Sequence, residues 1–230
     1  ALDNANHHPD AAAKAQHQAF AEFMVPIVKG WCTETAQEVT YLGVQVHGGM
    51  GFIEETGAAQ HYRDARIITI YEGTTGIQAN DLIGRKTARD GGAIARKVIA
   101  EIKATAAGLK SSADPSLQVI GAELERAIGA LQRALDWMVP TFGSDPREAF
   151  AGSVPYLRLW GVVCGGWQMG RAALIAARKL GDGEGDADFM RAKIVTARYY
   201  ADALLPQAQS LASEVTQAGE STLALAAAQF

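Results

Sequence analysis

The sequence predicts an all-α protein built as a helical bundle, and three observations lead to this fold class. Alanine, the residue with the highest helix propensity, occupies 43 of 230 positions, whereas aromatic residues make up only 7%. Apolar residues recur every three or four positions over several long segments, which is the spacing of one helix face. Short polar stretches with glycine, proline or aspartate separate these segments and provide helix ends. Because alanine is a poor strand residue, the composition favours packed helices over a β-sandwich.

Two helices are expected within the first 46 residues. Asp10 is a candidate N-cap for the alanine-rich segment 11–24. Pro26 is expected either to break this helix or to occupy the first turn of the next one, because proline lacks the N–H that a helix interior uses. The next helix spans residues 27–46. It ends at His47-Gly48-Gly49, where glycine permits a left-handed exit.

Residues 48–76 are expected to form a long loop, because several glycines and many polar side chains are crowded into this span. Long loops in compact domains tend to carry function. Regular structure is expected to resume near Thr75 as a helix that continues to Arg85. The run Asp90-Gly91-Gly92 predicts a domain boundary or a bend.

The rest of the chain carries four long amphipathic segments. They span residues 93–109, 116–139, 153–180 and 188–215, and Pro206 should kink the last of them. Helices of this length joined by short polar loops predict an antiparallel bundle.

Charge and cysteine content exclude several function classes. With 21 basic and 25 acidic residues, a net charge of −4 offers no positive excess for nucleic acid or anionic lipid. The two cysteines, Cys32 and Cys164, are far apart and fit neither a disulfide framework nor a metal site, which favours a reducing, cytoplasmic location. The pair His7 and His8 lacks a third ligand at a suitable spacing, so no metal site is expected. The sequence shows no apolar run of membrane-spanning length and no signal peptide.

The first candidate site is the glycine cluster that follows the helix 27–46, within Gln45-Val46-His47-Gly48-Gly49. Its exposed backbone N–H groups could hold a phosphate or pyrophosphate, because glycine lets an anion approach the main chain. The same pattern also serves as an ordinary helix end and turn. It is not a P-loop, because no Gly-Lys-Ser/Thr follows.

The second candidate site is Glu72, a carboxylate between Ile70-Tyr71 and Gly73. Burial beside these apolar neighbours would make Glu72 a base strong enough to remove a proton from carbon, and we expect it to lie beside the glycine cluster. Gly73 leaves room for a substrate near the backbone. The alternative is a glutamate that caps the helix at Thr75, and composition alone favours this alternative.

Together, the two sites resemble a known signature. The run QVHGGMGF followed by YRDARIITIYEGTTGIQ closely resembles the C-terminal signature of the acyl-CoA dehydrogenases, a flavin-dependent family. The resemblance covers about residues 11–90 and identifies residues 1–90 with the end of that family's C-terminal helical domain. Residues 91–230 resemble the additional helical domain of a longer subgroup, the 3-methylmercaptopropionyl-CoA dehydrogenase type.

The resemblance assigns a role to each matching residue. Glu72 would be the catalytic base that takes the α-proton of an acyl-CoA. Its main-chain N–H and a flavin hydroxyl would bind the thioester carbonyl, and Gly73 would line the substrate path. Thr74 and Thr75 would approach FAD, whereas Gly76 stands where many relatives have glutamine. The residues that would meet the FAD pyrophosphate of a neighbouring subunit are Gln45, Val46, His47, Gly48 and Gly49.

The resemblance also implies partners and a larger protein. FAD, an acyl-CoA substrate, an electron-transfer flavoprotein and a homo-oligomer with FAD contacted across subunits are expected. The family's N-terminal helical and central β-domains do not occur in these 230 residues, so the chain is expected to be a C-terminal fragment that is inactive alone. Two alternatives remain: a non-catalytic helical assembly module, which residues 91–230 would suit, and a related acyl-CoA oxidase.

Overall fold

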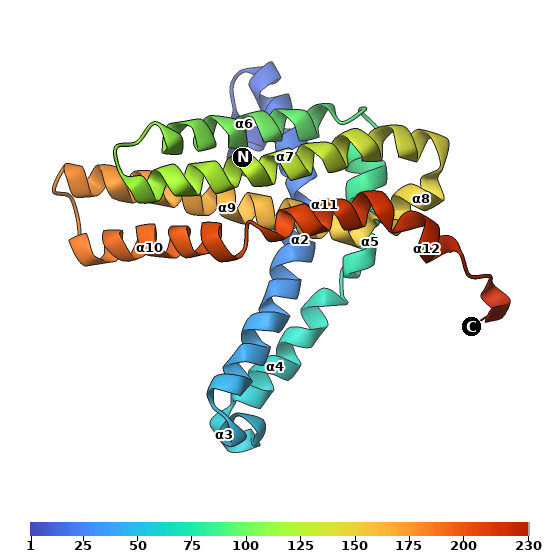
Figure 1. The fold of residues 1–230 in the computed structure, drawn as a ribbon, viewed down its shortest axis with the longest axis horizontal. Helices are drawn as coiled ribbons and strands as arrows, with labels where there is room; N and C mark the ends of the chain where they lie inside the picture. The colour runs from blue at the N-terminus through green and yellow to red at the C-terminus, as the bar shows by residue number, and fades with distance from the viewer. Residues whose placement is uncertain (230) are drawn as a thin grey trace.

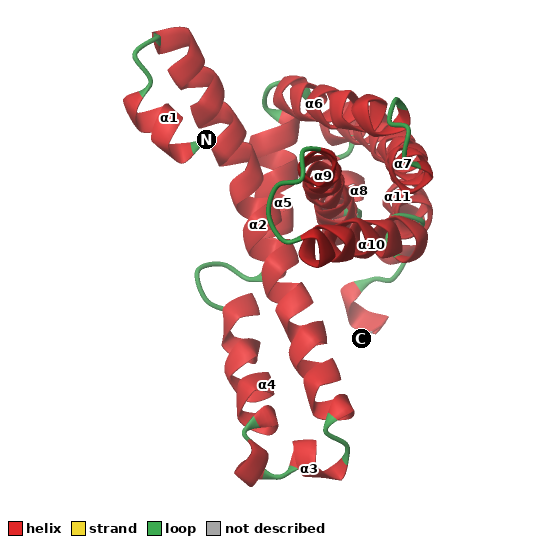
Figure 2. Cartoon of the chain, turned by 90° about the vertical axis from the view of Figure 1, so that its left-hand side faces the viewer, coloured by secondary structure: helices red, strands yellow, loops and turns green. Residues whose placement is uncertain are grey.

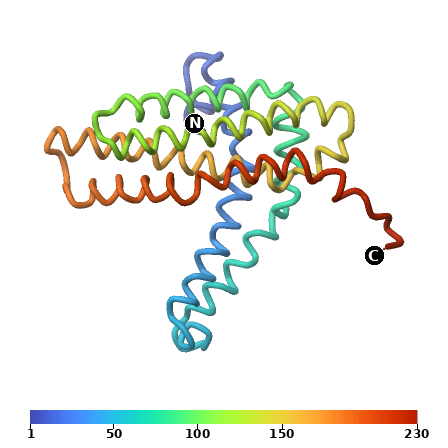
Figure 3. Tube along the Cα trace, in the orientation of Figure 1, coloured from blue at the N-terminus to red at the C-terminus, as the bar shows by residue number. Residues whose placement is uncertain are grey.

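A computed structural model describes residues 1–229, and within them it contains helices and no strand. Figures 1 and 3 show two parts: a bundle of long, roughly parallel or antiparallel helices, and a helical arm that projects from it. The predicted all-α class is therefore confirmed. The α-helices, in chain order, are α1 (Leu2–His7), α2 (Ala11–Val46), α3 (Gly49–Phe52), α4 (Ala58–Arg66), α5 (Thr75–Asp81), α6 (Ala93–Lys110), α7 (Pro115–Ser144), α8 (Pro146–Ala151), α9 (Ser153–Gly181), α10 (Ala187–Ala203), α11 (Gln207–Gln217) and α12 (Gly219–Leu223).

Helix α2 extends unbroken over 36 residues and belongs to both parts. Its start is as predicted, because the Asp10 carboxylate accepts the N–H groups of Ala12 and Ala13. The expected break at Pro26 is wrong. Pro26 is buried inside α2, and its neighbours Phe23 and Ile27 belong to the hydrophobic core. Packing of this helix face compensates for the missing backbone hydrogen bond.

The bundle is organised around α9. Figure 2 looks along the bundle and shows α9 enclosed by α6, α7, α10 and α11, with α2 and α5 on the remaining side. Helix α9 is apolar over most of its circumference, and Tyr156, Leu159, Trp160 and Val163 are fully buried. The amphipathic segments predicted for α6, α7 and α9 match these helices. The expected single kinked helix 188–215 is wrong, since α10 and α11 are separate helices on either side of Pro206.

The predicted boundary at residues 90–92 is a tight turn with two left-handed glycines, Gly91 at φ 64° and Gly92 at φ 83°. The Asp90 carboxylate accepts the N–H groups of Gly92, Ala93 and Ile94 and so caps α6. One continuous hydrophobic core contains residues from both sides of this turn. The division into domains 1–90 and 91–230 stays a prediction.

The arm consists of the C-terminal half of α2, the short helix α3 at the tip and the returning helix α4 (Figures 1 and 2). The expected long loop over residues 48–76 is therefore wrong for most of that span. The 3₁₀ turns η1 (Glu54–Thr56) and η2 (Ile67–Thr69) flank α4. Helix α4 packs on α2, where the Gln37 amide donates to the Ala65 carbonyl and the ring of Tyr41 meets that of Tyr62.

Candidate active site

Glu72 lies in the short loop between η2 and α5 (Thr75–Asp81), at the base of the arm. It is the one non-glycine residue with a positive φ, 53°, in the part of the chain that the structure describes. Gly73 follows at φ 91°. L-residues rarely adopt this left-handed conformation, and it persists only where the surroundings enforce it. The loop therefore holds the Glu72 backbone in a conformation that L-residues rarely adopt.

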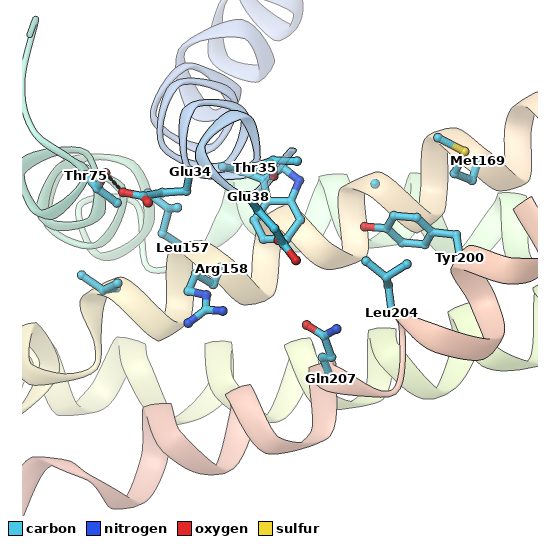
Figure 4. A pocket seen from close by; sticks show the side chains of 13 residues that line it. Glu34, Thr35, Glu38, Thr75, Leu157, Arg158, Met169, Tyr200, Leu204 and Gln207 are labelled. Atoms are coloured by element: carbon cyan, nitrogen blue, oxygen red, sulfur yellow. Dashed lines mark hydrogen bonds between the residues drawn. The ribbon is translucent and has the colours of Figure 1, made fainter. Parts of the chain in front are cut away.

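Side-chain hydrogen bonds from α2 and α5 hold this loop. The Gln78 amide donates to the Glu72 carbonyl at 3.1 Å. The Lys29 ammonium donates to the Gly73 carbonyl at 2.7 Å. On the far side of the loop, the Thr75 hydroxyl donates to the Glu34 carboxylate, as Figure 4 shows.

The alternative role for Glu72 as the helix cap is wrong. Thr74 is the N-cap of α5, and its hydroxyl accepts the N–H of Ile77 at 3.4 Å. The Glu72 carboxylate makes no hydrogen bond or ion pair with any described residue, and the side chain is exposed. Its carboxylate is consequently free to react with a molecule that approaches this loop.

The expected apolar burial of Glu72 is not found in this chain. Ile70 is 45% and Tyr71 is 50% exposed, so neither covers the carboxylate. The loop lies at the edge where the arm leaves the bundle, and side chains of α2 and α5 hydrogen-bond to it.

The glycine cluster lies at the tip of the arm. All five residues from Gln45 to Gly49 are exposed. Gly48 has φ 60° and ψ −142°, so the chain leaves α2 through a glycine with positive φ, but the predicted left-handed helical conformation is wrong. A Cβ added at Gly48 or Gly49 would meet no atom within 4 Å, so the backbone here is open to an anion. The His47 ring contacts the Gly43 carbonyl at 2.8 Å, which keeps it on the helix end.

The two candidate sites are at opposite ends of the arm. Lys29 contacts the loop of Glu72, whereas His47 is 18 residues further along α2, which corresponds to about 27 Å at 1.5 Å per residue. The expectation that Glu72 lies beside the glycine cluster is therefore wrong within one chain. The reason is that α4 is a helix and carries the chain back along the full length of the arm.

The arm carries exposed apolar side chains on α2, at its tip and on α4. Those with more than a third of their surface exposed include Val39, Tyr41, Leu42, Val46, Met50, Phe52, Ile53 and Tyr62. A hollow of about 720 Å³ lies among Tyr41, Val44, Phe52 and Tyr62. Apolar surface of this extent marks a site of contact with another polypeptide or ligand.

Sequence reasoning missed a cleft between the arm's base and the bundle. It has a volume of about 640 Å³ and lies between α2, α5 and the helices α9 to α11. Figure 4 shows Glu38, Arg158 and Gln207 directed into this space. The available signal was Arg158, the one charged residue in the largely apolar run 153–170.

Other kinds of site are not seen in residues 1–229. No group of three or more His, Cys, Asp or Glu side chains could hold a metal ion. No described helix is long and apolar enough to cross a membrane. Cys32 and Cys164 are both free, as predicted. Burial raises the pKa of the Cys164 thiol to about 12, so this thiol stays protonated near neutral pH.

Comparison with known proteins places the chain in a family. Residues 4–87 match the model of the acyl-CoA dehydrogenase C-terminal domain, and residues 98–226 match the model described as acetyl-CoA dehydrogenase C-terminal like. The chain is 52% identical over 222 residues to 3-methylmercaptopropionyl-CoA dehydrogenase of Ruegeria pomeroyi, which covers 96% of this chain and 37% of that protein.

Two further relatives extend the comparison. The chain is 30% identical to butyryl-CoA dehydrogenase of Syntrophomonas wolfei, over 85% of this chain and 33% of that protein. It is 36% identical over 69 residues, 30% of this chain and 18% of that protein, to subunit CarC of the caffeyl-CoA reductase-Etf complex of Acetobacterium woodii. The chain belongs to the acyl-CoA dehydrogenase family, and it spans about a third of the length of these two dehydrogenases.

Proposed function

We propose that this chain supplies the catalytic base, Glu72, and part of the FAD contact surface of an acyl-CoA dehydrogenase. The observation that carries the proposal is the conformation of Glu72: a left-handed, exposed, unpaired carboxylate in a loop fixed by side-chain hydrogen bonds. Such a group is held in place and yet remains free to accept a proton.

The reaction breaks two C–H bonds and forms one C=C bond. The Glu72 carboxylate takes the α-hydrogen of the acyl thioester as a proton. When bound, FAD would supply the acceptor for the β-hydrogen, which leaves carbon with both bonding electrons. The acyl chain would become a trans-2-enoyl-CoA, and the proton would stay on Glu72.

The peptide N–H of Glu72 stabilises the charge that develops on the thioester oxygen. This N–H donates to no backbone carbonyl in the described chain, so it is available to the substrate. A donor fixed before reaction is more effective than water, which must reorient. Gly73, next to it, has no side chain that would block the approach of the thioester.

The residues at the arm's tip fit a nucleotide pyrophosphate. Gly48 and Gly49 leave the backbone open, and a side chain at either position would fill that space. Because the tip lies about 27 Å from the loop of Glu72, the two sites would contact FAD molecules of different subunits. Thr74 and Thr75 lie beside Glu72 and would contact the FAD that serves it. This arrangement and the exposed apolar surface of the arm support a homo-oligomer.

The relatives' names suggest substrate and partner. We infer a short acyl-CoA, because the two dehydrogenases are named for 3-methylmercaptopropionyl-CoA and butyryl-CoA. CarC belongs to a complex with Etf, which supports an electron-transfer flavoprotein as the electron acceptor. The two free cysteines support a cytoplasmic location.

The test is Glu72→Gln in the complete gene product, assayed with both acyl-CoA substrates. Turnover should fall by about 100- to 10,000-fold while the yellow colour of bound FAD is retained. The control is Glu101→Gln, an exposed glutamate of α6 with no side-chain partner in the described chain. Unchanged turnover in Glu72→Gln would favour a helical assembly module, and oxygen consumption in place of Etf reduction would indicate an oxidase.

The 230-residue chain on its own should be inactive. Ile70 and Tyr71 leave the Glu72 carboxylate open to water, and the exposed arm lacks a partner for its apolar faces. A flavin titration checks this expectation. Tight FAD binding with acyl-CoA turnover by the isolated chain would contradict it.

A further inference from the structure

Lys29 is a half-buried cation directed at the loop that carries Glu72. Its ammonium donates to the Gly73 carbonyl at 2.7 Å and lies 5.9 Å from the centre of the Tyr71 ring. Lys29 forms no ion pair with any carboxylate in the described chain. Its interactions are therefore made with the residues on either side of Glu72.

Lys29 and Gln78 together fix the two peptide groups around Gly73. Gln78 binds the Glu72 carbonyl, and Lys29 binds the Gly73 carbonyl. These carbonyls belong to the peptide groups on either side of Gly73, the second of two consecutive residues with positive φ. A left-handed glutamate needs such external contacts to persist. The Lys29 contact is the stronger of the two, because its donor is charged and the distance is short.

The position of Lys29 along α2 is fixed by the neighbouring residues. A Cβ at Gly30 would lie 2.7 Å from the Leu157 side chain of α9, and a Cβ at Gly161 of α9 would lie 2.4 Å from the Trp31 ring. Helices in such close contact cannot slide without a clash. Lys29 thus lies next to a contact that sets the register of α2 against the bundle.

We propose that Lys29 is a positioning residue for Glu72. It holds the Gly73 carbonyl so that the Glu72 carboxylate faces the α-carbon of the substrate while the Glu72 N–H faces the thioester oxygen. This proposal rests on the proposed function of Glu72 as the catalytic base. It also gives residues 91–230 a role, because α9 fixes the helix that carries Lys29.

The test is Lys29→Met in the complete, FAD-loaded gene product, beside Lys14→Met. Lys14 is an exposed lysine on the same helix without a side-chain partner in the described chain. We expect kcat of Lys29→Met to fall by about 10- to 100-fold, with KM and FAD absorbance close to wild type. The deuterium isotope effect with α-deuterated substrate should rise, because proton removal becomes slower than the other steps. Lys29→Arg, which keeps a charged donor, should recover part of kcat.

A second readout is independent of turnover. Amide hydrogen exchange of residues 70–74 should be faster in Lys29→Met than in Lys14→Met, since the loop loses a hydrogen bond. Equal exchange and equal kcat in these two variants, with Glu72→Gln inactive, would overturn the role of Lys29 and leave the proposed function intact. Full activity of Glu72→Gln would overturn both.

Discussion

Trp31 of α2 packs directly on Gly161 of α9, and a Cβ at position 161 would lie 2.4 Å from the indole ring. Trp31 belongs to the part of the chain that carries both candidate sites, whereas Gly161 belongs to the central helix of the bundle. The absence of a side chain at Gly161 is therefore what allows the two parts to meet closely.

Gly161→Ala should destabilise the protein by about 1–3 kcal/mol, because the added methyl forces the Trp31 ring or the helix to move. The free energy of unfolding in urea measures this effect. Gly181→Ala, at the other end of α9, is the matched control, since a Cβ there meets nothing within 4 Å. Equal stability of the two variants would show that the contact is not tight.

The bundle helices could be predicted because their sequences carry apolar residues at helical spacing. In α7 (Pro115–Ser144), Leu117, Leu124 and Leu131 recur at helical spacing, and all three are buried. Asp10 likewise caps α2 as its residue type indicates. In such elements local propensity and tertiary packing favour the same structure.

Other features depend on contacts that no local pattern shows. Helix α2 continues through Pro26 because the flanking side chains are buried against distant helices. Helix α4 has few apolar residues, and its contacts with α2, Gln37 with Ala65 and Tyr41 with Tyr62, join residues 28 and 21 positions apart. The loop that contains the left-handed Glu72 accepts a hydrogen bond at Gly73 from Lys29, which lies 43 positions before Glu72 in the chain. The candidate residues could be selected from the sequence, and their role stays a prediction, but the separation of Glu72 from the glycine cluster along the arm could not be predicted.

Gly49→Val should weaken FAD binding in the complete protein by about tenfold, equivalent to about 1.4 kcal/mol. The added side chain would occupy the open space where the pyrophosphate is proposed to lie, and a Cβ at this position meets no atom of this chain within 4 Å. FAD content and a flavin titration measure the effect. Gly143→Val is the control, since Gly143 on α7 also faces open space. Normal FAD affinity in Gly49→Val would argue against a pyrophosphate contact at the tip.

Alkaline pH should destabilise the fold through its buried thiol. Burial raises the pKa of Cys164 from 9.0 to about 12. Folding therefore favours the protonated thiol. The contribution of this thiol to the free energy of unfolding is fully present below pH 9. It is lost as pH rises from about 9 to about 12, by up to about 1.4 kcal/mol per pH unit. Burial similarly raises the pKa of Tyr156 from 10.0 to about 12, which adds to the loss above pH 10.

In Cys164→Ala, the free energy of unfolding should fall less steeply as pH rises from about 9 to about 12. Urea denaturation at several pH values measures this dependence. Cys32→Ala, which removes an exposed thiol, should leave the slope unchanged. The same slope in Cys164→Ala as in wild type would mean that the thiol is not protected from ionisation.

The most direct test of the central claim is exchange of the α-hydrogen in D₂O. The substrate is an acyl-CoA without hydrogen on its β-carbon, so that only proton transfer to and from the α-carbon can occur. Mass spectrometry should show deuterium entering the α-position with the FAD-loaded wild-type protein and with Glu101→Gln. Glu72→Gln should show no exchange above the protein-free rate, and exchange at the wild-type rate in this variant would contradict the assignment of Glu72 as the base.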